Sequence, residues 1–391
     1  MDTRLTSLLT VLSLAFTGLA GALILAGPGP AVVFGGVSAL ALAGWLWTGL
    51  LPAERGRGLV APYLTLPPLL LLLESLRYAD GWVGQIATRH AAGFAPLVFQ
   101  DAPWFALLVC APVSLILFGG YLLCRDRRIG HYMAWWAAFY AVAQGLVQIA
   151  LTAAGGRGAL ALLACVPALA LVGTGLRLFQ GLIADRAAAI AEPAPLTDRQ
   201  RRLWAVLFVV CVVLYAVPLL RQAGPLPVVV IVGSMLGGMV GWWRTTSRRP
   251  ADPARAVPLF LLLLTFFYIH VGEEALTDFS GAIAAITGVP WREPDFMLLI
   301  GLLGPAVWFL AAWSLWRRQP AGNFVFWFLI VGMILGEPTH LLVFPFVAMA
   351  KFGIGYEYFS GMYTALFPMI PAILALVQLV TDHREWQRGR V

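Results

Sequence analysis

The sequence predicts an all-α, polytopic membrane protein of about twelve transmembrane helices, arranged as two six-helix parallel repeats. Three observations support this prediction. Hydrophobic residues make up 60% of the 391 residues and charged residues only 12%, whereas a soluble domain carries about 25% charged residues. Windows of about 20 apolar residues recur along the whole chain. Finally, stretches in the two halves match each other at a constant spacing.

The apolar windows place twelve spans. We expect all of them to be helical, because strand-like alternation is absent and only helices satisfy the backbone within lipid without a closed barrel. The spans are 6–26, 30–51, 59–77, 103–123, 131–153, 159–181, 203–220, 225–243, 256–276, 296–316, 323–345 and 358–380. The first 27 residues resemble a signal peptide, but the run is long enough to span and another span follows at once, so we expect it to be retained.

Basic residues set the predicted orientation. With the N-terminus inside, 20 of the 26 arginine and lysine residues fall in inner segments. The outer segments carry Arg77, Arg89, Arg157, Arg221, Arg292 and Lys351. This bias predicts a multi-pass protein of the cytoplasmic (inner) membrane with both termini cytoplasmic. It also accounts for the net charge of +7, and we see no basic patch with interleaved aromatic residues, so we expect the lipid bilayer as partner and no nucleic acid.

The stretch 187–200 is the only long inner connection with linker composition. It predicts an N-terminal six-helix repeat (1–186), a cytoplasmic linker (187–202) and a C-terminal six-helix repeat (203–391). Nine identities at an offset of 197 support the repeat. They match Gly27, Pro28, Pro30, Val32, Val33, Gly36, Gly44, Trp45 and Thr48 with Gly224, Pro225, Pro227, Val229, Val230, Gly233, Gly241, Trp242 and Thr245.

Further along, the repeat predicts that the second copy carries the working site. After a three-residue insertion Glu74 matches Glu274 at an offset of 200, and at an offset of 192 Gln148 matches His340. His270 corresponds to Leu70 of the first copy, which is apolar. The first copy is therefore expected to be a structural partner with a degenerate site.

Five polar residues interrupt two apolar spans of the second half. His270, Glu273 and Glu274 share one helix face at i, i+3 and i+4, and Glu337 and His340 are also i and i+3. His270 lies about 21 Å along its span and His340 about 26 Å along its own, so we expect both sets in the outer half of the bilayer. Ionisable residues within membrane helices usually face a bundle interior or a wet cavity.

Two chemistries fit these five residues. As a general acid/base set they would suit isomerisation, hydration or cyclisation of a lipophilic substrate that enters from the bilayer. As metal ligands they resemble bundle sites with paired His and Glu on facing helices, and they would suit zinc, iron or manganese. The sequence has no His-Glu-x-x-His motif, so it does not indicate a zincin protease.

A purely structural interpretation stands beside both chemistries. A histidine near a helix end is often a satisfied polar residue, and an acidic pair at the outer boundary is often solvated. Glu74 is then expected to hydrogen-bond Gln144 or Gln148. Charged residues of the outer loops, such as Asp278 and Glu293, are expected to be solvated.

His270-x-x-Glu273-Glu274 resembles the signature of the HXXEE-domain family of bacterial integral membrane proteins. His340 and the run from Tyr358 to Ala365 resemble the rest of that pattern, over about 256–380. In this chain Phe359 splits the Tyr-Ser pair and the proline before Gly361 is missing. The resemblance implies a shared polar site and leaves the reaction open. The second half is also similar in character to emopamil-binding-type sterol isomerases.

Two other functions compete with a membrane-embedded enzyme. Twelve spans, two six-span copies and a cytoplasmic central linker are also typical of a proton-coupled secondary transporter of major-facilitator-like layout, in which buried carboxylates form a proton relay. Against a transporter, the predicted polar set lies at the outer end and in one half only. The third alternative is an assembly protein without small-molecule chemistry, and the sequence indicates no particular oligomeric state.

Overall fold

The computed structural model describes residues 4–26, 28–48, 56–81, 105–154, 158–183 and 196–389. The chain divides into two compact units, which are described separately. Unit 1 comprises Met1–Ala189 with Pro305–Phe309, and unit 2 comprises Ile190–Gly304 with Leu310–Val391. Much of the predicted linker, from 187 to 195, lies outside the described residues.

Unit 1 consists of helices among its described residues. They are α1 (Arg4–Ala26), α2 (Pro28–Trp47), α3 (Gly56–Leu64), α4 (Leu66–Ala79), the π-helical turn η2 (Phe105–Cys110), α8 (Ala111–Cys124), α9 (Arg128–Ala154) and α10 (Ala159–Ile183). Helix α9 packs against α2, α8 and α10, and α4 packs against α10.

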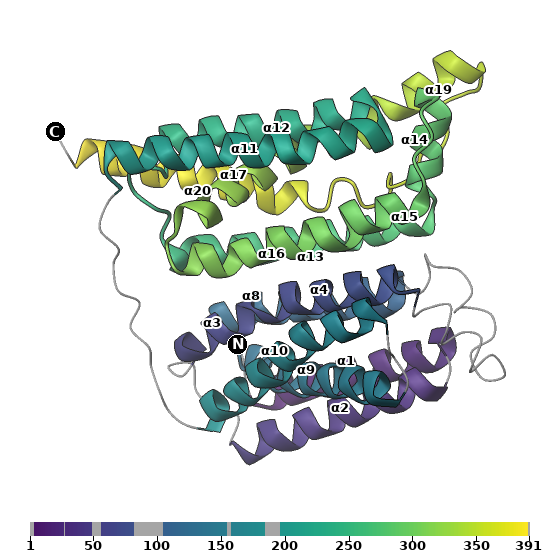
Figure 1. Cartoon of the computed structure of the whole chain (residues 1–391). Coiled ribbons are helices and arrows are strands. Elements are labelled where there is room, and N and C mark those ends of the chain that lie inside the picture. Colours follow the sequence, from purple (N-terminus) through teal and green to yellow (C-terminus); the bar gives the residue numbers. More distant parts are fainter. Residues whose placement is uncertain are drawn as a thin grey trace. The chain divides into compact units, whose positions relative to one another are not determined.

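Unit 2 is also helical. Its elements are α11 (Asp198–Ala223), α12 (Pro225–Arg244), α13 (Pro253–Leu276), α14 (Phe279–Thr287), α15 (Glu293–Phe296), the π-helical turn η3 (Met297–Leu302), α16 (Leu303–Trp316), α17 (Pro320–Leu335), α18 (Thr339–Leu342), α19 (Phe344–Phe352) and α20 (Met369–Arg388). Helix α12 packs along α17, and α20 packs against both α13 and α17. Helices α14 and α19 meet at the end of this bundle away from the C-terminus (Figure 1).

Within the described residues, eight helices are long and apolar enough to cross a membrane. Three shorter apolar helices, Leu5–Gly21, Ala31–Trp47 and Ala111–Cys124, accompany them. Many large apolar side chains on these helices are exposed, for example Leu214 at 68% and Val229 at 69%, as expected for surfaces that face lipid rather than water. The chain is thus a multi-pass membrane protein, and the count of twelve spans stays a prediction.

Local sequence explains where the helices that carry the polar residues begin and break. Asp252 caps α13 by accepting a hydrogen bond from the Ala254 amide, and a proline follows at the first helical position. Helix α17 ends at Leu335, and Pro338, which has no amide hydrogen, lies in the turn before α18. Glu337 therefore lies in a break between two helices rather than within a continuous span.

The last helix begins later than the sequence predicts. We expected a span over 358–380, whereas α20 starts at Met369 and runs to Arg388. Gly353 and Gly361 adopt positive φ angles of 68° and 84°, which end α19 and keep the following chain out of a helix. Residues 353–368 form a non-helical segment with turns, called the outer strap below.

Gly241 allows α12 to lie close against α17. A Cβ atom at this position would lie 2.5 Å from the ring of Trp327, and an indole has little freedom to move away. We expect Gly241→Ala to lower the free energy of unfolding by about 1–3 kcal/mol through overpacking. Thermal unfolding in detergent measures this.

Gly233 of the same helix is the matched control, because a Cβ atom there meets no atom within 4 Å. Gly233→Ala should leave stability unchanged or raise it by up to about 1 kcal/mol through helix propensity. Equal stability of the two variants would show that the close approach of α12 and α17 is not required.

Candidate functional site

Four ionisable side chains of unit 2 converge in the interior. His270 and Glu274 come from α13, Glu337 from the break after α17, and His340 from α18. All four are buried, with exposed fractions between 1% and 7%. The Nε2 atom of His270 lies 2.8 Å from Oε2 of Glu337 and 3.7 Å from Oε1 of Glu274. The Nε2 atom of His340 lies 3.5 Å from Oε1 of Glu274 and 4.0 Å from Oε2 of Glu337.

The opposite ring nitrogens fix the tautomers of the two imidazoles. Nδ1 of His340 lies 2.7 Å from the carbonyl oxygen of Ser360. A carbonyl only accepts, so Nδ1 must carry the hydrogen. Nδ1 of His270 lies 3.0 Å from Oγ1 of Thr364, whose own hydrogen goes to Glu273. In its neutral form, each imidazole therefore presents an Nε2 lone pair to Glu274 and Glu337.

Two atoms at the centre of the cluster lack a hydrogen-bond partner. Nε2 of His270 and Oε2 of Glu337 are 2.8 Å apart, yet neither makes a hydrogen bond of acceptable geometry among the described residues. An uncompensated buried polar atom costs on the order of 1–3 kcal/mol. A lone pair on nitrogen facing a carboxylate oxygen is repulsive unless a proton or a cation lies between them.

Glu273 points away from this centre, toward the outer strap. Its carboxylate accepts hydrogen bonds from the hydroxyl of Tyr358 at 2.7 Å, from the amides of Tyr363 and Thr364 at 3.0 and 2.8 Å, and from the Thr364 hydroxyl. Burial and the bond to this carboxylate raise the pKa of Tyr358 above its usual value, so the phenol remains a donor. Glu273 anchors the strap and orients His270 through Thr364.

Gly361 lets the strap lie directly on both imidazoles. A Cβ atom at this position would lie 2.6 Å from Nδ1 of His340 and 2.9 Å from Cε1 of His270, so no other residue fits without movement. On the other side of His340, the rings of Phe279 and Phe344 lie with centroids 5.0 and 5.1 Å from the imidazole. The two rings thus form an aromatic wall beside His340, and the carboxylates of Glu274 and Glu337 are buried as well.

Unit 1 holds a different buried polar group. Arg77, which we expected in an outer loop, is only 3% exposed and pairs with Glu74. Its Nε donates to Gln148 at 2.9 Å, and one terminal nitrogen donates to Gln144 at 2.8 Å. Glu74 thus reaches the two glutamines only through Arg77, whereas we expected direct hydrogen bonds.

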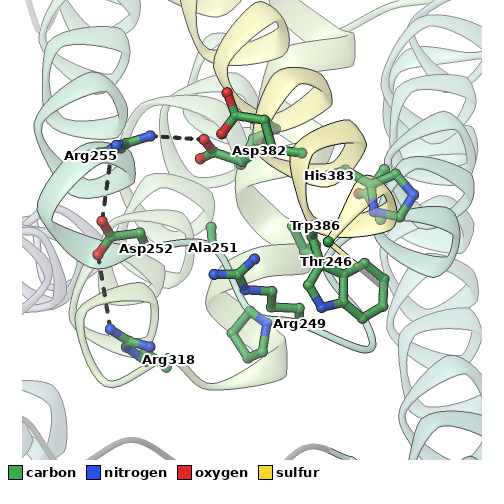
Figure 2. Close-up of a pocket in the computed structure, with 14 residues that line it drawn as sticks. Thr246, Arg249, Ala251, Asp252, Arg255, Arg318, Asp382, His383 and Trp386 are labelled. Atoms are coloured by element: carbon green, nitrogen blue, oxygen red, sulfur yellow. Dashed lines mark hydrogen bonds and ion pairs between the residues drawn. The ribbon is translucent and has the colours of Figure 1, made fainter. Parts of the chain in front are cut away.

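A separate cavity of about 630 Å³ lies at the opposite end of unit 2, beside the end of α12 and the start of α13. Figure 2 shows Arg255 between Asp252 and Asp382, with Arg318 on the far side of Asp252. The Arg255–Asp382 pair spans 3.0 Å, and the Arg255 side chain is 58% exposed. Ion pairs exposed to this degree contribute little to stability, and none of the five predicted site residues lines this cavity.

The structure brings together four of the five predicted site residues and turns Glu273 outward. Sequence reasoning missed the groups that hold the site in place, namely the Ser360 carbonyl, the Thr364 hydroxyl and Gly361. The sequence feature that could have pointed to them is the run Tyr358–Ala365, which formed part of the family resemblance although no site role was predicted for its residues. Asp278 of the outer loop caps α14 by accepting from the Gly281 amide.

The buried ion pair of unit 1 gives a stability test. Arg77→Leu would leave the Glu74 carboxylate buried without its cation, and we expect it to cost about 3–5 kcal/mol. Arg255→Leu, which removes an exposed pair, should cost at most about 1 kcal/mol. Thermal unfolding in detergent compares the two variants, and similar losses would mean that the Arg77 pair is solvated.

Comparison with known proteins adds little to this description. No protein-family model matches the chain, and no curated protein matches it. One solved structure, titled an outward-facing conformation of a multidrug resistance MATE family transporter of the MOP superfamily, aligns with 98% of this chain and 92% of its own. The two are 14% identical with a TM-score of 0.17, so the alignment carries no argument about fold or function.

Proposed function

We propose that this protein is a membrane-embedded enzyme that acts on a lipophilic substrate at the cluster of His270, Glu274, Glu337 and His340. The observation that carries the proposal is the convergence of two imidazole Nε2 atoms on two buried carboxylates. Buried ionisable groups within membrane helices are costly and usually serve a function. A purely structural role would be met more cheaply by apolar packing.

An open, apolar surface groove supports a lipophilic substrate. It has a volume of about 530 Å³ and begins two residues after His340. Its lining is formed by Leu342, Val343, Phe346, Val347, Ala350 and Lys351. An apolar groove with one lysine among its lining residues suits a hydrocarbon chain that ends in a polar or anionic group. The aromatic wall around His340 likewise favours an apolar reactant.

We further propose that the chain is a relative of the HXXEE-domain proteins and lies in the bacterial inner membrane, with both termini cytoplasmic. The support is the pattern of His270, Glu273 and Glu274 together with the bias of arginine and lysine between loops. The contact of the outer strap with all three residues adds to it. If the chain is a relative of these proteins, the outer strap is part of the polar site that the motif marks.

We also propose that the two units are copies of one six-helix repeat. Gly44 faces the ring of Trp135 as Gly241 faces that of Trp327, and an added Cβ atom would lie 2.7 and 2.5 Å from the rings. The π-helical turns η2 and η3, and the helices α8 and α16 after them, each have bounds that differ by 192 residues. Asp126 and Arg318, at the same offset, both have positive φ angles.

Proton-coupled transport is the second candidate function. The sequence argued against it because the charges were expected in one half only. Arg77 and Glu74 now place a buried charged pair in unit 1 as well, and transporters built from two repeats use polar groups of both halves. An experiment can separate the enzyme from the transporter, because only an enzyme changes the covalent structure of a lipophilic molecule.

The experiment compares purified protein with a Glu274→Gln variant. Each is incubated in detergent micelles with a total bacterial lipid extract, and the lipid species are followed by liquid chromatography with mass spectrometry, which also separates isomers of equal mass. We expect the wild type to deplete at least one lipid species with appearance of a product, and the variant to lose at least about 100-fold in rate, as expected for removal of an acid/base group.

His383→Ala is the control, because His383 lies on α20 among the lining residues of the other cavity and should not affect turnover. An unchanged lipid profile together with proton movement in proteoliposomes, lost in Glu274→Gln, would replace the enzyme by a transporter. An unchanged lipid profile without proton movement would overturn both.

A further inference from the structure

We propose that His270, His340 and Glu337 bind one divalent metal ion of the zinc type, with Glu274 as the fourth ligand. The inference rests on the proposed function, since it names the cofactor of the same site. Acid/base and metal chemistry were both open on sequence grounds, and the contacts of the four side chains favour the metal. The ligand atoms of His270, Glu337 and His340 all lie within 4.8 Å of one another.

The spacing of the ligand atoms fits a tetrahedral ion. Bonds of 2.0–2.1 Å to nitrogen and oxygen place neighbouring ligand atoms about 3.4 Å apart. Four distances between an Nε2 atom and a carboxylate oxygen are 2.8, 3.5, 3.7 and 4.0 Å. They therefore scatter about the tetrahedral value, and small side-chain rotations suffice to equalise them.

The orphaned atoms point to the same conclusion. His270 Nε2 and Glu337 Oε2 are buried and have no hydrogen-bond partner of acceptable geometry, although they are close to each other. A nitrogen lone pair and a carboxylate oxygen at this distance repel each other unless a proton or a cation compensates them. Because Nε2 of His340 and Oε1 of Glu274 also lie close by, one metal ion can compensate all four atoms at once.

The outer strap supplies the outer contacts that metal-bound histidines use. Metal-ligating imidazoles almost always donate their other ring N–H to a carbonyl, a carboxylate or another acceptor. His340 donates to the Ser360 carbonyl, and His270 donates to Thr364, which in turn is held by Glu273. These contacts keep both imidazoles in the Nδ1–H tautomer and direct both Nε2 atoms inward.

Charge complementarity favours a dication. Two carboxylates and two neutral imidazoles carry a charge of −2, which a divalent ion neutralises. The imidazole pair favours zinc-like ions over magnesium or calcium, which prefer all-oxygen sites. When bound, such an ion would supply a Lewis acid within the membrane, while the aromatic wall of Phe279 and Phe344 excludes bulk water.

The test measures metal directly. Full-length protein is purified in detergent, stripped with a chelator, loaded with zinc and analysed by mass spectrometry for metal per chain. We expect about one zinc per chain in the wild type and in His383→Ala, and near-complete loss in His270→Ala and His340→Ala. Cobalt(II) loading should give the intense visible absorption of tetrahedral coordination in the wild type and in His383→Ala, and not in His270→Ala or His340→Ala.

Thr364 provides a variant that leaves every ligand in place. Thr364→Val removes the acceptor of His270 Nδ1 and should weaken zinc binding by about 10–100-fold, as for other outer contacts of metal sites. Thr364→Ser keeps the hydroxyl and should restore affinity. Competition with a chromophoric chelator measures both. This pair answers the objection that the histidine variants fail to fold.

The result that overturns the proposal is equal zinc content in the wild type and in both histidine variants, or no zinc and no cobalt spectrum in folded wild type. This failure is distinct from failure of the proposed function. Lipid turnover without metal would leave an acid/base enzyme, whereas metal binding without turnover would leave a metal site whose enzyme role is wrong.

Discussion

Two carboxylates and two imidazoles share one water-poor space in unit 2, and compensation of the carboxylate charge is the constraint on which the rest of that unit depends. Lipid cannot solvate a charge, and each isolated buried ion costs several kcal/mol even after relaxation. The ion-pair partners of Glu274 and Glu337 among the described residues are the two imidazoles. Helix α13, the break after α17 and helix α18 must therefore bring these four side chains within contact distance of one another.

The helix break at 336–338 and the outer strap are consequences of that requirement. A continuous helix through Pro338 would carry Glu337 and His340 at a fixed angular spacing, whereas the break frees the backbone to bring both toward α13. The strap then reaches the imidazoles only because the chain is not helical between α19 and α20. Gly361 makes the closest approach, and its positive φ angle belongs to the same bend.

Sequence reasoning found the membrane class and the main polar residues, because apolar windows and i, i+3 spacing are local patterns. It placed Glu273 with the site, because a 3.6-residue period does not distinguish two neighbouring positions on a broad helix face. Strap contacts with the histidines cross 94 residues from His270 to Thr364 and 20 from His340 to Ser360. No local pattern encodes such contacts, and a carbonyl acceptor is not identified by residue type at all.

Arg77 was missed for a related reason. At the end of an apolar run an arginine is usually a topology marker, and only the structure reveals that it is buried against Glu74. An arginine that marks topology and an arginine that forms a buried ion pair can both occupy this position at the end of a span, so the sequence does not distinguish them. The hydrogen bonds to Gln144 and Gln148, which lie on another helix, decide between them.

The two units neutralise their buried carboxylates in different ways, and the contrast bears on the proposed metal ion. In unit 1 the counter-ion of Glu74 is the guanidinium of Arg77, which is covalently part of the protein and fills the polar space with its hydrogen bonds. In unit 2 the positions that face Glu274 and Glu337 are occupied by imidazoles, which can be neutral donors of lone pairs. A site with two carboxylates and no permanent cation of its own is neutral only when protons or a divalent ion enter from outside. Unit 1 is thus closed to an external cation by its own arginine, while unit 2 has the composition and the spacing to accept one.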